Sequence, residues 1–290
     1  MPSLIDFRRR IRSVKNTQQI TKAMKMVSAA KLRRAQDRVI AARPYAAQMR
    51  EMLANLAQAA QSDDSASESV WLAVRQPKNI DVVLVTSDKG LAGAFNSNLI
   101  KAAQRFIAEH PGANISLTLV GRKGRDFYKR RNAAIVGEYV NILAKPAYAD
   151  AANVASEIIR RYREGRTDAV YVINNDFKSV MTQTLSVQQL LPVDLPPAAA
   201  DGATTRDYIY EQSPLAMLER LMPRYVEVAI FRAMLETGAA EHAARMTAMD
   251  KASSNAKDVI EALTLYMNRV RQAAITKEII EVVSGAAAAS

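Results

Sequence analysis

The stretch that follows Ser213 is almost free of residues that end a helix. Pro214 stands at a first-turn position after a capping serine, and Pro223 can kink or restart the helix. Beyond Pro223, only Gly238 interrupts the helical pattern up to Gly285. A run of about 60 residues predicts a helix of roughly 90 Å. A helix this long needs another chain segment against which to bury its apolar face.

The first 60 residues predict a second long helix. Ser3 can cap it, and the segment contains no glycine and one proline, Pro44, which should bend the helix rather than end it. Steps of three and four residues mark a coiled-coil seam, and its apolar positions are Leu4, Phe7, Ile11, Val14, Leu32, Ala35, Val39, Ala42, Ala46, Met49, Leu53 and Leu56. Between them the seam is polar, at Gln18, Thr21, Lys25 and Ser28. The apolar residues shift there to Ile20, Ala23, Met24 and Val27, which predicts a local change of partner face.

The two terminal segments, residues 1–60 and 214–290, most simply pair as an antiparallel coiled coil. The predicted seam continues in the second segment at Val259, Leu263, Tyr266, Val270 and Ala273. If both helices start from one central domain, residue 4 lies level with about residue 270, and the last 15 to 20 residues extend alone by roughly 25–30 Å. An apolar arc of roughly 160° follows this end, at Ile275, Ile279, Ile280, Val282, Val283 and Ala286. We therefore expect other protein chains to surround it.

The central segment, residues 61–213, changes from helical spacing to alternating strands and helices. Strands are predicted at residues 80–86, 115–121 and 169–174, with an edge strand at 180–190. Helices are predicted at residues 98–109, 123–131 and 151–164. A polar linker (61–69), a proline-rich loop (190–202) and a short extended piece (208–211) flank them. This order predicts a Rossmann-like α/β domain with a mostly parallel sheet, carried by the paired terminal helices.

The basic charge is concentrated in the N-terminal helix. The chain has a net charge of +11, and residues 1–60 hold 13 basic and 3 acidic residues. Uncompensated charge at this density favours an acidic partner over a merely solvated helix face. Nucleic acid is an alternative partner, but Phe7 is the only aromatic residue before Tyr45, so the segment offers no stacking platform.

Several classes of chemistry find little support. The chain has no cysteine, which excludes disulfides and thiolate metal sites and fits a reducing cytoplasm. It shows no long apolar run and no leader-like N-terminus, so we expect any membrane role to go through a partner. Two glycine-containing turns, residues 87–98 and 120–127, resemble phosphate loops without matching their spacing, and tight strand-to-helix turns are the better interpretation. His110 and His242 are far apart in sequence and favour solvated helix positions over a catalytic or metal site.

Four segments together resemble the γ subunit of F-type ATP synthases. They are ITKEIIEVVSGAAAA (275–289), NTQQITKAMKMVSAAKLRRAQ (16–36), SDKGLAGAFN (87–96) and ARMTAMDKASSNA (244–256). The match covers nearly the whole chain in the right order. Ala92 and Ala94 stand where the family turn often has Cys and Gly, and the cysteine-containing insert of chloroplast relatives is missing, so thiol control is not expected.

The resemblance implies a noncatalytic rotor shaft without a cofactor, on the cytoplasmic face of a bacterial inner membrane. Its terminal helices would turn inside a ring of three α and three β subunits, and its α/β domain would rest on the membrane c-ring beside the ε subunit. The implied contacts with β are Lys22, Met24 and Lys25 at acidic loops, and Arg271, Gln272 and Thr276 at a catch point. Ile279 and Val283 would face an apolar sleeve, and Tyr208 and Glu211 would touch the ring.

Two other functions stay open on the sequence alone. A small α/β enzyme with helical dimerisation arms would bind a cofactor tightly as an isolated chain. A coiled-coil nucleic-acid binder would bind duplexes with a steep salt dependence. The torque-transmitting subunit accounts best for the long helices, the localised charge and the unpaired apolar end.

Overall fold

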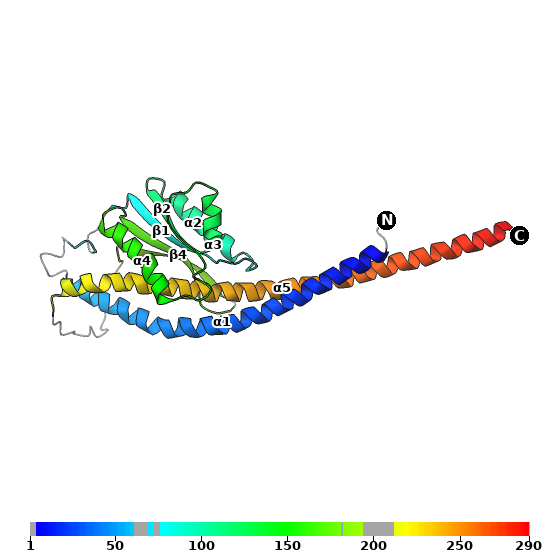
Figure 1. Cartoon of the computed structure of the whole chain (residues 1–290), viewed down its shortest axis with the longest axis horizontal. Helices are drawn as coiled ribbons and strands as arrows, with labels where there is room; N and C mark the ends of the chain where they lie inside the picture. The colour runs from blue at the N-terminus through cyan, green and yellow to red at the C-terminus, as the bar shows by residue number, and fades with distance from the viewer. Residues whose placement is uncertain (1–3, 61–68, 72–75, 181, 194–211, 290) are drawn as a thin grey trace. The chain divides into compact units, whose positions relative to one another are not determined.

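The fold was analysed in a computed structural model that describes residues 4–60, 69–71, 76–180, 182–193 and 212–289 (Figure 1). Two long helices are the first and last elements: α1 spans Leu4–Ala60 and α5 spans Pro214–Ala289. Both contain a proline in their interior, Pro44 and Pro223, and both continue through it. Pro223 therefore does not restart the helix.

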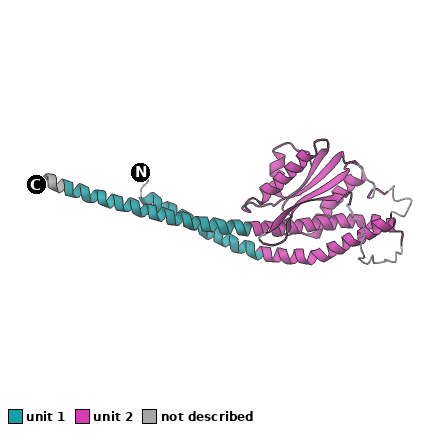
Figure 2. Cartoon of the chain, turned by 180° about the vertical axis from the view of Figure 1, so that it is seen from behind, with its two compact units in different colours: residues 1–30, 245–290 teal, residues 31–244 magenta. Residues whose placement is uncertain are grey.

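The chain divides into two compact units (Figure 2). Unit 1 consists of residues 1–30 and 245–290, and unit 2 of residues 31–244. Each unit contains one portion of α1 packed on one portion of α5, so the prediction that the terminal helices pair is confirmed.

Unit 2 contains a five-stranded sheet in the order β3-β2-β1-β4-β5. The strands are β1 (Asn79–Val85), β2 (Asn114–Val120), β3 (Ile135–Tyr139), β4 (Ala169–Phe177) and β5 (Gln183–Leu191). The first four run parallel, and β5 pairs antiparallel with β4 at the edge. The mostly parallel Rossmann-like sheet and its edge strand are confirmed.

Three helices complete the layers of unit 2: α2 (Phe95–Glu109), α3 (Arg122–Lys129) and α4 (Tyr148–Arg163). The core between the sheet and the long helices joins Val83 and Val172 of the sheet with Ile158 of α4, Leu53 of α1 and Val226 of α5. Figure 1 shows α4 on the side of the sheet that faces α5, with α2 and α3 on the other side. The long helices are therefore one wall of the domain core.

Two details differ from the sequence predictions. The short strand β3 was not predicted, because its five residues include a glycine and alternate only between half-buried and exposed, which leaves no buried apolar run in the sequence. Leu190 and Leu191 are the buried end of β5 rather than the start of a loop. Residues 61–68 of the predicted linker, 194–202 of the loop and 208–211 of the extended piece lie outside the described residues.

The seam of α1 follows the predicted spacing. Every position from Leu4 to Leu56 in the three-four series is buried or half-buried, including the polar ones. Ile20 and Val27 are exposed instead, so α5 does not follow the shifted apolar residues and the predicted change of partner face does not occur within the chain. The seam of α5 was predicted less well: Val259, Tyr266 and Ala273 are exposed, and Ala256 is buried.

Candidate partner-binding surfaces

The helix pair of unit 1 ends at a ring contact. Phe7 of α1 packs on Tyr266 of α5 with ring centroids 5.1 Å apart and planes inclined by 57°. Phe7 is buried, whereas about half of Tyr266 is exposed. Because α1 begins at Leu4, one turn before Phe7, α5 has no counterpart on α1 beyond about residue 270. The register predicted from the sequence is therefore correct.

A polar layer lies in the middle of this helix pair. The hydroxyl oxygens of Thr21 and Ser253 are 2.7 Å apart, and the Gln18 amide donates to the Ser253 carbonyl at 3.3 Å. One turn along α1, Lys25 Nζ lies 2.6 Å from Asp250 Oδ1. These cross-helix hydrogen bonds fix the register of the pair in place of apolar contacts.

The three residues predicted to meet acidic loops of β are Lys22, Met24 and Lys25, which we call the collar, and they differ in their surroundings. Lys22 is exposed and Met24 is half-buried. Lys25 is committed in part to its ion pair with Asp250, although its side chain stays 42% exposed. The collar therefore offers one exposed cation, at Lys22, and one that already has a counter-charge.

The unpaired end of α5 is an apolar surface with no covering side chains among the described residues. The exposed fractions are 48% for Ile275, 58% for Ile279, 59% for Ile280, 71% for Val282 and 62% for Val283. Five large apolar side chains exposed over about two and a half helix turns mark a surface that associates with other protein. We call residues 271–284 the tip.

The remaining predicted contacts follow the same helix. Arg271, Gln272 and Thr276 are exposed at the start of the tip, and the Thr276 hydroxyl donates to the Gln272 carbonyl at 3.0 Å. About 18 residues separate them from Ser253, or roughly 27 Å of helix. The collar and the tip are thus two separate surfaces. Tyr208 and Glu211 lie outside the described residues.

A buried carboxylate joins three elements of unit 2, and no feature of the sequence predicted it. The Glu236 side chain on α5 is 1% exposed and accepts from Arg43 Nε and Nη2 of α1, both at 3.2 Å. It also accepts from the Phe177 amide at the end of β4, at 2.8 Å, and Arg43 donates to the Phe177 carbonyl. This cluster fastens both long helices to the sheet.

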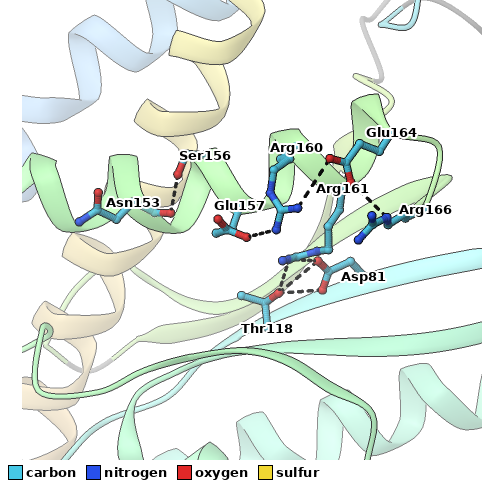
Figure 3. Close-up of polar contacts among 9 residues, drawn as sticks. All are labelled: Asp81, Thr118, Asn153, Ser156, Glu157, Arg160, Arg161, Glu164 and Arg166. Atoms are coloured by element: carbon cyan, nitrogen blue, oxygen red, sulfur yellow. Dashed lines mark hydrogen bonds and ion pairs between the residues drawn. The ribbon is translucent and has the colours of Figure 1, made fainter.

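A second buried cluster lies between the sheet and α4 (Figure 3). Asp81 of β1 accepts from Arg161 Nη2 at 2.5 Å and from the Thr118 hydroxyl at 2.9 Å. Burial raises the pKa of Asp81, and the Arg161 guanidinium offsets part of the rise. The neighbouring Arg160 instead pairs with Glu157 on the exposed side of α4. In the sequence, the one feature that could have indicated this cluster is Asp81, an acidic residue inside the mostly apolar strand β1.

The glycine-containing turns are packing features. Gly121 has φ +102°, and a Cβ there would lie 2.2 Å from the Thr86 carbonyl oxygen, so only glycine fits. At the start of α3, the Asp88 carboxylate accepts from the amides of Arg122 and Asn141 at 3.0 and 2.9 Å. An acidic side chain thus stands at the helix N-terminus where a phosphate would bind.

The two histidines lie in different settings. The His110 ring stacks on Phe106 with centroids 4.3 Å apart, and His110 Nδ1 lies 2.8 Å from the Phe106 carbonyl oxygen. His242 is half-buried on α5. Among the described residues, no three His, Asp or Glu side chains are grouped as metal ligands, and no helix is long and apolar enough to cross a bilayer.

The fold and its exposed surfaces define an α/β protein carried on two long paired helices, one of which ends in an exposed apolar surface. The family model for ATP synthase matches residues 3–289. The gamma chain of Solibacter usitatus ATP synthase is 60% identical over 289 residues, covering all of both chains. The gamma chain of Geobacter sp. strain M21 is 50% identical, covering 98% of each chain.

Solved structures agree in fold. The central stalk and c-ring structure of the Tetrahymena thermophila mitochondrial ATP synthase contains a chain that matches 81% of this chain and 99% of its own length, with a TM-score of 0.63 and 27% identity. A chain of the Euglena gracilis mitochondrial ATP synthase rotor matches 94% of this chain and 98% of its own length, with a TM-score of 0.67 and 19% identity. The chain belongs to the family of ATP synthase gamma chains, the noncatalytic central-stalk subunits of the rotor.

Proposed function

We propose that this chain transmits torque between a proton-driven membrane c-ring and a catalytic head of three α and three β subunits. The observation that carries the proposal is the tip, an apolar helix surface that extends past the end of α1. Such a surface is stable in water only inside a sleeve of other protein. The transmission needs no reactive side chain, because one shaft that presents different surfaces to three equal sites shifts each site in turn between states of different nucleotide affinity.

Each predicted contact has a role in this proposal. Ile279 and Val283 bear on an apolar sleeve, and Arg271, Gln272 and Thr276 form polar contacts with β near its entrance. Lys22, Met24 and Lys25 meet acidic loops of β lower down. The sheet-bearing foot, residues 61–213, rests on the c-ring beside the ε subunit, with Tyr208 and Glu211 at the ring. The complex is peripheral, on the cytoplasmic face of a bacterial inner membrane.

Removal of residues 279–290 tests the role of the tip. We expect weaker assembly with α and β or lower coupling, and an unchanged sheet signal in circular dichroism, because the described core residues of the foot all precede the tip. A large loss of sheet signal, or full coupling without residues 279–290, would contradict the proposal. Copurification of the wild-type chain with two larger nucleotide-binding chains tests the assembly itself.

The collar is tested by charge changes that separate structure from contact. Lys22→Glu should lower the number of protons pumped per ATP hydrolysed in inverted membrane vesicles, because it brings a like charge to acidic loops. The double variant Lys25→Asp, Asp250→Lys keeps the cross-helix ion pair but moves the cation to α5, so it tests whether the position of the charge matters. Unchanged pumping in both variants would remove the collar from the mechanism.

A further inference from the structure

A groove runs through unit 2 between α1, α5 and the segment that joins β3 to α4. Its first cavity has a volume of about 290 Å³ and is rimmed by Lys31, Arg34 and Arg38 of α1 and by Lys145 of the joining segment. The three α1 residues are spaced three and four apart, so they lie on one face of the helix. Leu143 and Leu235 form its apolar floor.

Two further cavities continue the groove, and their walls are mostly apolar. The second, of about 590 Å³, shares Arg38 and Lys145 with the first and is otherwise lined by Ala41, Ala42, Pro146, Ala147, Phe231 and Leu235. The third, of about 260 Å³, shares Ala42 and Phe231 with the second and adds Tyr45, Ala46, Tyr148, Val228 and Arg232. We call the three together the α1–α5 groove. Four cations gather at one end, and the rest is mostly apolar; its one further cation, Arg232, already has a counter-charge in Glu236, with Nε 3.8 Å from Oε1.

The cations at the rim have no counter-charge within the part of the chain that the structure describes. None of Lys31, Arg34, Arg38 and Lys145 forms an ion pair there, and no acidic side chain lines any of the three cavities that form the groove. Like charges three or four residues apart on one helix destabilise it slightly. A negative group held among the four would relieve this repulsion and gain charge-assisted hydrogen bonds from the two guanidinium groups.

The apolar part of the groove favours anions that carry an alkyl chain. An inorganic anion would use only the rim, whereas an alkyl chain would also cover Ala42, Phe231 and Leu235. Few polar atoms line this part of the groove, so a nucleotide base would find little to hydrogen-bond there. We propose that the α1–α5 groove binds a single-chain anionic amphiphile, with its phosphate or carboxylate head at the rim and its alkyl chain along α5.

Calorimetric titration of the full-length chain tests this ligand class directly. Decyl phosphate, kept below its critical micelle concentration, should bind at one site about tenfold or more tighter than inorganic phosphate, which has only the head. Decyl phosphate should also bind more tightly than decyl maltoside, which has the same alkyl chain and no charge, by a similar factor. Decanoate in a parallel titration distinguishes a fatty acid from a phosphate-bearing lipid. Equal binding of inorganic phosphate and decyl phosphate would overturn the proposal.

Two variants of adjacent residues localise the site. Arg34→Glu reverses a charge at the rim and should weaken decyl phosphate binding about tenfold or more. Arg33→Glu changes the net charge equally, but Arg33 is exposed and lines none of the three cavities, so binding should stay within about twofold. Equal losses in the two variants would mean that the chain attracts anions without a site.

A third variant tests the apolar part. Ala42 is half-buried and lines the second and third cavities. Ala42→Glu places a carboxylate where the alkyl chain would lie and should abolish the gain of decyl phosphate over inorganic phosphate, with helical circular dichroism confirming that the variant is folded. A retained gain would overturn the placement of the chain. Tighter binding of an acidic amphipathic helical peptide than of decyl phosphate would assign the groove to a protein partner instead.

Discussion

Arg43 and Glu236 meet as a fork, with two N–H donors of one guanidinium on the two oxygens of one carboxylate, each at 3.2 Å. Arg43 belongs to α1 and Glu236 to α5, and both also bond the backbone of Phe177 at the end of β4. Because the Glu236 carboxylate is almost fully buried, the cost of removing it from water is offset only while all of these partners stay in place. The cluster therefore ties both long helices to the end of β4.

Glu236→Ala should destabilise unit 2 by about 1–3 kcal/mol, mainly because it leaves the Phe177 amide without an acceptor; the Arg43 side chain is 44% exposed, so water can solvate its charge. The measurement is the free energy of unfolding from urea titration followed by circular dichroism. Glu219→Ala is the matched control: Glu219 lies on the same helix and is exposed, so its loss should cost no more than about 0.5 kcal/mol. Similar losses in both variants would show that the buried cluster contributes little.

Gly121→Ala should cost about 3–5 kcal/mol, because the added Cβ would meet the Thr86 carbonyl oxygen at 2.2 Å in a backbone conformation that side chains rarely adopt. Gly165 separates the two effects. It also has a positive φ, of +70°, but a Cβ there would meet nothing within 4 Å, so Gly165→Ala should cost only about 1–2 kcal/mol. Thermal or urea unfolding of both variants gives the difference. Equal costs would refute the close-packing interpretation of this turn.

The pattern of apolar residues was sufficient to predict both long helices, the mostly parallel sheet and the unpaired tip. It worked because hydrophobic spacing reports which side of an element is covered. The buried charges could not be predicted in the same way. Arg43 and Glu236 are nearly 200 residues apart, and neither breaks the spacing of its helix, so only the fold brings them together.

The polar seam shows a different limit. At Ile20 and Val27 the spacing indicated a covered face, and the side chains are exposed within this chain. Hydrogen bonds between Thr21, Gln18 and Ser253 hold α5 on the polar face instead. In a single sequence, apolar residues that pack against another part of the same chain look the same as those that contact another protein chain.

Asp81 provides a pH test of the second buried cluster. Burial raises its pKa above the ordinary value of 3.8. A carboxyl group whose pKa is raised by folding contributes stability below its unfolded pKa and loses that contribution as the pH rises through its folded pKa. Asp81→Asn does not titrate, so the free energy of unfolding of the wild type should fall relative to that of the variant between pH 3.8 and neutrality. Urea titrations across this range measure the difference.

The opposite trend would identify the dominant interaction. If the free energy of unfolding of the wild type instead rises relative to that of Asp81→Asn as the pH rises, the Arg161 ion pair outweighs the cost of burial. The pKa of Asp81 is then lowered by folding. Thr118→Val removes a hydrogen bond to the same carboxylate and leaves the ion pair in place. It should raise the pKa of Asp81 further and move the pH-dependent loss of stability to higher pH.

The Thr21–Ser253 pair tests whether the polar layer of unit 1 adds stability or only sets the register. Thr21→Val removes the cross-helix bond to Ser253 and should raise the hydrogen-exchange rates of amides near both residues, by about 1 kcal/mol of opening free energy. Thr21→Val combined with Ser253→Ala should cost no more than about 0.5 kcal/mol beyond the single variant, because the same cross-helix bond is already lost in Thr21→Val. A clearly larger loss in the double variant would show that the Ser253 hydroxyl contributes separately, through its bond to the Met249 carbonyl within α5.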